Sequence, residues 1–296
     1  MNLDQMTAQI ASADGFIAAL DQSGGSTPKA LRGYGVEDDE WDGDEAMFAK
    51  IHEMRSRVIT TPSFSNGQVI GAILFERTMD SEVEGQSTAD ALKARGVVPF
   101  IKVDQGLADE ADGVQLMKPL DKLPALLEKS SGKGMFGTKM RSVIKSANSA
   151  GIAAIVEQQF VVGNQIADAG LMPMLEPEFD ITADDRAEGE KVLLAEIMKG
   201  LDALPEGRQV MLKLSIPVEP GLYAPAIAHP NVLRVVALSG GYSTDDACER
   251  LSNNSGMIAS FSRGLLQDLR KGQSDGEFDG VLGKAIDQIA CASAAG

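Results

Sequence analysis

Several short apolar segments carry charged residues near their C-terminal ends. The charged residues are Asp21, Lys102 and Asp104, Lys139 and Arg141, Glu176 and Glu178, and Lys213. Side chains two positions apart lie on the same face of a strand, so each pair is expected to face one side. Lys and Glu are rarely buried without a partner. A charged residue in one segment could simply form a structural salt bridge. Charged residues in all five segments together favour a functional site.

Lys213 lies in the middle of the apolar segment Val210–Ile216, which makes it the best candidate for a nucleophile. Desolvation and nearby positive charge both favour the neutral amine, which attacks a carbonyl carbon to form an imine. That chemistry also needs a carboxylate that moves protons, and Glu176 and Glu178 are the candidates. The segment therefore predicts Schiff-base chemistry.

Three serine-containing loops are candidate phosphate sites, and two of them contain Ser-Gly-Gly. Leu238–Ser243 (LSGGYS) and Ser260–Arg263 (SFSR) follow the last two apolar segments, and a second Ser-Gly-Gly begins at Ser23. Each Ser-Gly-Gly alone could be a plain tight turn. Glycines let backbone amides approach an oxyanion, and Arg263 and Lys102 would supply positive charge. Cradles on opposite sides of one site predict a substrate phosphorylated at both ends.

The histidines give little support for a metal site. The chain has only two, His52 and His229, and neither has a second His or Cys at ligand spacing. A magnesium ion bound by carboxylates is an alternative, but each candidate carboxylate already has a lysine as a possible partner. We expect neither a metal nor another cofactor.

The elements that must position these groups alternate along the chain. Apolar positions recur at helical spacing from Met47 to Val58 and from Leu194 to Leu201, and Ile152–Ala169 reads as a long helix. The strand candidates are 16–20, 69–75, 97–103, 137–143, 172–176, 210–214, 233–238 and 257–261. This pattern predicts an α/β fold, a (β/α)8 TIM barrel with a closed parallel sheet, as a single domain over residues 1–296. The alternative is a doubly wound open sheet, but Asp21–Ser26 lacks the G-x-G-x-x-G spacing of a dinucleotide site.

Composition limits the possible partners and the compartment. A net charge of −16 argues against nucleic acid. The N-terminal residues do not resemble a signal peptide, and no apolar run is long enough for a membrane helix. Cys248 and Cys291 form no motif, so we expect a cytoplasmic protein. Homo-oligomerisation stays open.

Over essentially its whole length the chain resembles the class I fructose-bisphosphate aldolases, in their shorter bacterial form. The resemblance rests on Phe16–Leu31 (FIAALDQSGGSTPKAL), Gly71–Met79 (GAILFERTM), Gly96–Leu107 (GVVPFIKVDQGL), Gly113–Pro119 (GVQLMKP), Phe136–Ile144 (FGTKMRSVI), Glu176-Pro-Glu178, Val210–Pro217 (VMLKLSIP), Val235–Tyr242 (VVALSGGY) and Gly256–Leu265 (GMIASFSRGL).

The resemblance implies roles for individual residues. Lys213 would form the imine with dihydroxyacetone phosphate, Glu176 would transfer protons, and Glu178 would orient the lysine. Asp21 would handle the proton of the hydroxyl beyond the cleaved bond, and Lys139 would stabilise the charge that develops there. The residues expected to bind substrate are Ser23, Ser26, Lys102 and Arg141 at one end, and Ser239, Gly240, Gly241, Ser260, Ser262 and Arg263 at the ketose-side phosphate.

The resemblance has limits and leaves alternatives. Animal members of the family have Glu where this chain has Gln22, and they carry a tail ending in a functional tyrosine, whereas no tyrosine follows Tyr242 here. A Schiff-base aldolase for tagatose 1,6-bisphosphate is the nearest alternative. The others are a non-catalytic phosphosugar-binding or surface-adhesion protein and a metal-dependent isomerase or aldolase.

Overall fold

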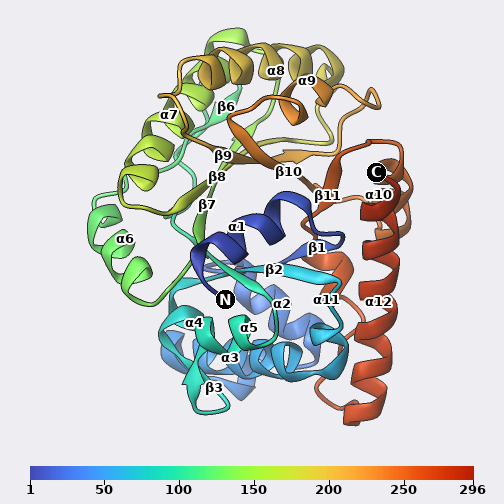
Figure 1. The fold of residues 1–296 in the computed structure, drawn as a ribbon. Helices are drawn as coiled ribbons and strands as arrows, with labels where there is room; N and C mark the ends of the chain where they lie inside the picture. Colours follow the sequence, from blue (N-terminus) through green and yellow to red (C-terminus); the bar gives the residue numbers. More distant parts are fainter.

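A nearly closed parallel sheet forms the centre of the molecule (Figure 1) in a computed structural model that describes residues 1–296. Its strands, in spatial order, are β1 (Phe16–Leu20), β2 (Val69–Leu74), β5 (Val98–Lys102), β7 (Gly137–Ile144), β8 (Met172–Phe179), β9 (Val210–Ser215), β10 (Val232–Leu238) and β11 (Met257–Ala259). Every neighbouring pair along this order is parallel. At the seam, the Ala19 amide donates to the Phe261 carbonyl at 3.3 Å. The predicted barrel and its eight strand positions are confirmed.

Helices connect the strands and cover the outside of the barrel (Figure 1). They are α2 (Ser26–Tyr34), α3 (Gly43–Thr60), α4 (Glu76–Asp80), α5 (Thr88–Ala94), α6 (Leu123–Gly132), α7 (Ser149–Asp168), α8 (Arg186–Asp202), α9 (Ala224–Ile227), α10 (Thr244–Ser252), α11 (Arg263–Leu266) and α12 (Asp275–Ala295). The minor elements are the 3-10 turns η1 (Asp38–Glu40) and η2 (Pro62–Ser65), the hairpin β3 (Glu82–Val83) and β4 (Gln86–Ser87), and β6 (Val114–Gln115), antiparallel to β7. The three helices predicted from periodicity are α3, α8 and α7.

The N-terminal segment forms a helix that the sequence pattern did not predict. Helix α1 (Leu3–Ser12) begins at Asn2, whose side chain and that of Gln5 form a capping box. Met6 and Ile10 pack against the apolar side chains inside the barrel. Gln9 Nε2 donates to the carbonyls of Ile70 and Gly96, near the N-terminal ends of two strands, at 2.8 and 2.6 Å. Helix α1 therefore covers the N-terminal end of the barrel.

The apolar core has two parts. The larger part lies between the strands and the outer helices. The smaller part fills the barrel interior and includes Ile17, Phe100, Met174, Met211 and Val236. Because this apolar layer and α1 fill the N-terminal half, the site must lie at the C-terminal ends of the strands. No helix has both the length and the apolar character to cross a membrane.

Candidate active site

Four charged side chains from β7, β8, β9 and the residue after β1 form a chain of contacts inside the barrel. Lys139 Nζ lies 2.6 Å from Asp21 Oδ2 and 2.9 Å from Glu176 Oε2. Lys213 Nζ lies 3.1 Å from Glu176 Oε1. The side chains of Lys139, Glu176 and Lys213 are each 4% exposed, and that of Asp21 is 13% exposed. One carboxylate thus bridges two buried ammonium groups, and the second carboxylate pairs with only one of them.

The neighbouring charges decide the ionisation of this cluster. Burial raises the pKa of Asp21 and of Glu176, but the ammonium groups of Lys139 and Lys213 outweigh it, and both pKa values fall below their ordinary range. Burial lowers the pKa of Lys139, but Asp21, Glu176 and Asp104 outweigh it, and the net effect raises this pKa. The two carboxyl groups are therefore ionised at neutral pH, and Lys139 is held as a cation.

The lowered pKa of Asp21 predicts a contribution to acid sensitivity. Because the folded-state value lies below the ordinary 3.8, stabilisation by Asp21 is complete above that pH and is lost as the pH falls through the folded-state value. We expect the free energy of unfolding to fall between pH 6 and pH 3 by about 1 kcal/mol more in the wild type than in Asp21→Asn. Urea unfolding at several pH values measures this difference. Parallel pH curves for the two proteins would contradict the expectation.

A second group of charged side chains comes from β5, the segment after it, β7 and β8. Lys102 Nζ lies 2.6 Å from Asp104 Oδ1, and Asp104 Oδ2 accepts from the Arg141 backbone amide at 3.2 Å. The Arg141 side chain forms an ion pair with Glu178. The family resemblance gives Glu178 the role of orienting Lys213, and the ion-pair partner of Glu178 is Arg141. The direct partner of Lys213 is Glu176.

The two loops expected to hold the ketose-side phosphate lie next to each other, because β10 and β11 are paired neighbours. In the first loop, Gly240 and Gly241 have φ values of +61° and +125°, which side chains rarely tolerate. A Cβ at Gly240 would also come within 2.5 Å of Ile181. In the second loop, Arg263 is exposed and has no carboxylate partner, and Ser260 is buried with its hydroxyl unpaired. This edge of the barrel therefore combines backbone that carries no side chain, at Gly240 and Gly241, with the unpaired guanidinium group of Arg263.

The loop after β1 does not lie opposite these two loops, so that expectation is wrong. Closure of the barrel places β1 beside β11, and the Gln22 side chain bonds directly to Ser262. Within the loop, the Ser26 hydroxyl accepts from the Ser23 amide at 2.9 Å and donates to the Ser23 carbonyl at 2.8 Å. Ser23 and Ser26 therefore form a local turn. Lys102 and Arg141 lie further round the barrel, on β5 and β7.

A buried ion pair supports the loops that follow β9 and β10. Arg186 and Glu190, both on α8, are 2.7 Å apart and almost completely buried. Arg186 also donates to the Ile216 carbonyl and, at 3.1 Å, to the Tyr242 hydroxyl, and Glu190 accepts from the Val218 amide at 2.8 Å. The pair thus ties the end of β9 to the Ser239–Ser243 loop.

Removing one member of this buried pair should destabilise the fold. In Arg186→Met, Glu190 would lose its cation while staying buried, so we expect the free energy of unfolding to fall by about 3 kcal/mol. The matched control is Lys199→Met on the same helix, where the pair with Glu196 is exposed and the loss should stay within about 1 kcal/mol. Urea unfolding at neutral pH compares them. Equal losses in the two variants would contradict the assigned role.

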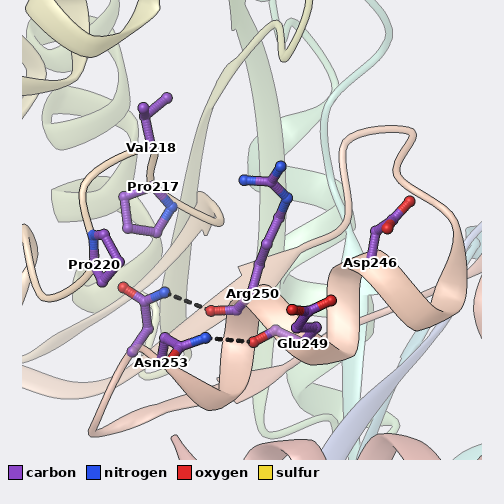
Figure 2. A pocket seen from close by; sticks show the side chains of 8 residues that line it. Pro217, Val218, Pro220, Asp246, Glu249, Arg250 and Asn253 are labelled. Carbon is purple, nitrogen blue, oxygen red and sulfur yellow. Dashed lines mark hydrogen bonds between the residues drawn. The ribbon is translucent and has the colours of Figure 1, made fainter.

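A separate pocket of about 280 Å³ lies behind the Ser239–Ser243 loop, between the chain after β9 and helix α10. Figure 2 shows Pro217, Val218 and Pro220 on one wall and Asp246, Glu249 and Arg250 on the other. The guanidinium of Arg250 also lies over the Tyr242 ring, 4.4 Å from its centroid. Neither Lys213 nor Glu176 lines this pocket, so it is distinct from the charged cluster inside the barrel.

Sequence reasoning missed the buried arginines. Arg55 occupies the same helix face as Ile51 and Val58, and it is fully buried. One arginine within an otherwise apolar helical stripe was the available clue. For Arg186 and Glu190 the only clue was an i, i+4 pair, which is common on exposed helices.

The histidines have polar partners far from the site. His52 Nε2 lies 2.9 Å from the Glu82 carbonyl, and His229 Nε2 lies 3.1 Å from Asp202 Oδ1. No three His, Cys, Asp or Glu side chains converge in a way that could hold a metal ion.

The fold and the cluster define the class of protein. A closed parallel barrel that gathers charged groups at the C-terminal ends of its strands is the arrangement of TIM-barrel enzymes. A family model, "Fructose-bisphosphate aldolase class-I", matches residues 2–211. The chain belongs to the class I fructose-bisphosphate aldolase family. It is therefore an aldolase, a carbon–carbon lyase, and its substrate is a small phosphosugar.

Solved structures agree with the barrel. Fructose-bisphosphate aldolase from Plasmodium falciparum, determined with TRAP and a small molecule inhibitor, has a TM-score of 0.78 and 19% identity, covering 99% of this chain and 95% of that chain. A Corynebacterium glutamicum protein, a structural genomics target, has a TM-score of 0.55 and 15% identity, covering 98% and 92%. At these identities the likeness shows the fold alone.

Proposed function

We propose that this aldolase reversibly cleaves fructose 1,6-bisphosphate to dihydroxyacetone phosphate and glyceraldehyde 3-phosphate through an imine on Lys213. The observation that carries the proposal is the unequal pairing of the two buried lysines. Two carboxylates hold Lys139 as a cation, whereas Lys213 contacts only Glu176. Lys213 is therefore the amine better suited to attack a carbonyl carbon.

The cluster can carry each proton transfer of the reaction. Glu176, 3.1 Å from Nζ, first takes a proton from the Lys213 ammonium group, and the neutral amine adds to the ketone carbon. Glu176 then returns this proton to the hydroxyl, which leaves as water. Asp21 then accepts the proton of the hydroxyl beyond the bond that breaks. The electron pair of that carbon–carbon bond moves into the protonated imine, and the aldehyde product departs. Lys139, in contact with both carboxylates, stabilises the changing negative charge.

The charged rim suits a substrate with two phosphates. The Ser239–Gly241 and Ser260–Arg263 loops would hold the ketose-side phosphate with backbone amides, hydroxyls and the free guanidinium of Arg263. Lys102 and Arg141 would attract the other phosphate from β5 and β7. Direct pairing of Lys102 and Arg141 with Asp104 and Glu178 means that substrate phosphate must compete with those carboxylates.

Borohydride trapping tests this function. Reduction in the presence of dihydroxyacetone phosphate should attach one substrate molecule to the chain, with loss of the ketone oxygen as water, and peptide mapping should place it on Lys213. Activity that survives a strong chelator would separate this mechanism from a metal-dependent one, and turnover of fructose and tagatose bisphosphates would separate the two substrates. An adduct on another residue, or none, would overturn the proposal.

A further inference from the structure

Arg55 is a fully buried cation without a carboxylate in direct contact. Its guanidinium donates to Thr78 Oγ1 at 2.7 Å, to the Gln22 carbonyl at 2.5 Å and to Gln22 Oε1 at 3.2 Å. Burial lowers the pKa of Arg55 and Asp21 partly offsets this, for a net pKa of about 10, so the group stays charged at neutral pH. Arg55 thus ties α3 and α4 to the loop that follows Asp21.

This arginine fixes which way the Gln22 amide points. Arginine has only donors, so the Gln22 oxygen must face it and the amide nitrogen must face away. Gln22 Nε2 accordingly donates to the Ala19 carbonyl at 3.2 Å and to the Ser262 hydroxyl oxygen. Gln22 is therefore the donor and Ser262 the acceptor in the bond across the barrel seam.

The direction of that bond controls what Ser262 can offer to a ligand. A hydroxyl that accepts from an amide keeps its own hydrogen, and that hydrogen must point away from the amide. Ser262 lies one residue before the unpaired Arg263, in the loop after β11. A phosphate bound there accepts hydrogen bonds only, so the Ser262 hydrogen would suit it.

We propose that Gln22 is a positioning residue that sets Ser262 as a hydrogen-bond donor to the substrate phosphate, with Arg55 holding the Gln22 amide in the required orientation. The identity of the ligand rests on the proposed function. Arg55 and Gln22 do not touch the reacting atoms in this scheme. They act through Ser262.

Glutamate at position 22 would reverse the bond without changing the size of the side chain. A carboxylate only accepts, so it would take the Ser262 hydrogen and place negative charge near the phosphate. Arg55 would still hold it, as an ion pair, so the variant should fold. Gln22→Glu therefore changes the hydrogen-bond direction and the local charge together.

The test compares a phosphorylated ketone with its unphosphorylated counterpart. The rate of borohydride labelling at Lys213 is measured against the concentration of dihydroxyacetone phosphate and, separately, of dihydroxyacetone. For Gln22→Glu we expect the half-saturating concentration of the phosphate ester to rise about tenfold or more, since a hydrogen bond to a charged group is lost. Labelling by dihydroxyacetone should change by less than about twofold, because it lacks the phosphate.

Two further variants separate hydrogen-bond direction from charge and from misfolding. Gln22→Met removes the donor without adding charge, and we expect a rise of a few fold for the phosphate ester only. In a Ser262→Ala background, Gln22→Met should have no further effect, because the hydroxyl that it orients is gone. Unchanged labelling by dihydroxyacetone also reports an intact Lys213 site in each variant.

The outcomes distinguish this inference from the proposed function. If wild-type protein labels at Lys213 but Gln22→Glu affects both ketones equally, or neither, the inference about Gln22 is overturned and the proposed function stands. An additive effect of Gln22→Met and Ser262→Ala would also overturn it. If the wild type fails to label at Lys213, the proposed function falls, and the inference with it.

Discussion

Lys213→Met is expected to abolish both the borohydride adduct and turnover of fructose 1,6-bisphosphate. Without the amine no imine forms, so the electron sink for carbon–carbon cleavage is absent, and we expect turnover to fall by about 10⁴-fold or more. The fold should survive, because methionine suits the apolar strand β9 and Glu176 keeps Lys139 as a partner. Mass spectrometry of the reduced protein and steady-state turnover measure the two losses.

Lys102→Met is the control for this experiment. Lys102 is also a lysine at a strand end, but it pairs with Asp104 and does not contact Lys213 or Glu176 in the ion pairs of the site. We expect weaker substrate binding, with the adduct still on Lys213. Persistent labelling of Lys213→Met would show that another amine is the nucleophile.

Glu176→Gln is expected to give the second-largest loss. The variant keeps the shape of the side chain but removes the proton carrier beside Lys213, and loss of a general acid–base group costs about 10²–10⁴-fold in rate. It also leaves Lys139 with Asp21 as its only carboxylate and Lys213 with none. The rate of imine formation, measured by borohydride trapping at successive times, should fall together with turnover.

Glu178→Gln provides the matched comparison. Glu178 lies two residues further along β8 and contacts Arg141, so its loss should affect phosphate binding more than imine formation. A much smaller fall in turnover is therefore expected than for Glu176→Gln. Equal losses would support the orienting role for Glu178 that the family resemblance implies.

The barrel and the charged strand ends can be predicted from local sequence patterns. Strands covered on both faces must be almost continuously apolar, which makes Val69–Leu74 and Val210–Ser215 recognisable, and a charge within such a run needs a functional or structural reason. Alternation along a strand also assigns Glu176 and Glu178 to one face from their spacing alone. These inferences succeed because they depend on residues within a few positions of one another.

The pairing of the charges depends instead on how the barrel closes. Asp21 contacts Lys139, and Lys139 shares Glu176 with Lys213, because strands far apart in the chain become neighbours or face each other across the barrel. The same closure places Gln22 against Ser262, 240 positions away. Packing of α3 against the loop after β1 brings Arg55 into contact with Gln22. Contacts of this kind depend on register and on the closing of the sheet. Neither the register nor the closing of the sheet produces a periodic pattern in the sequence.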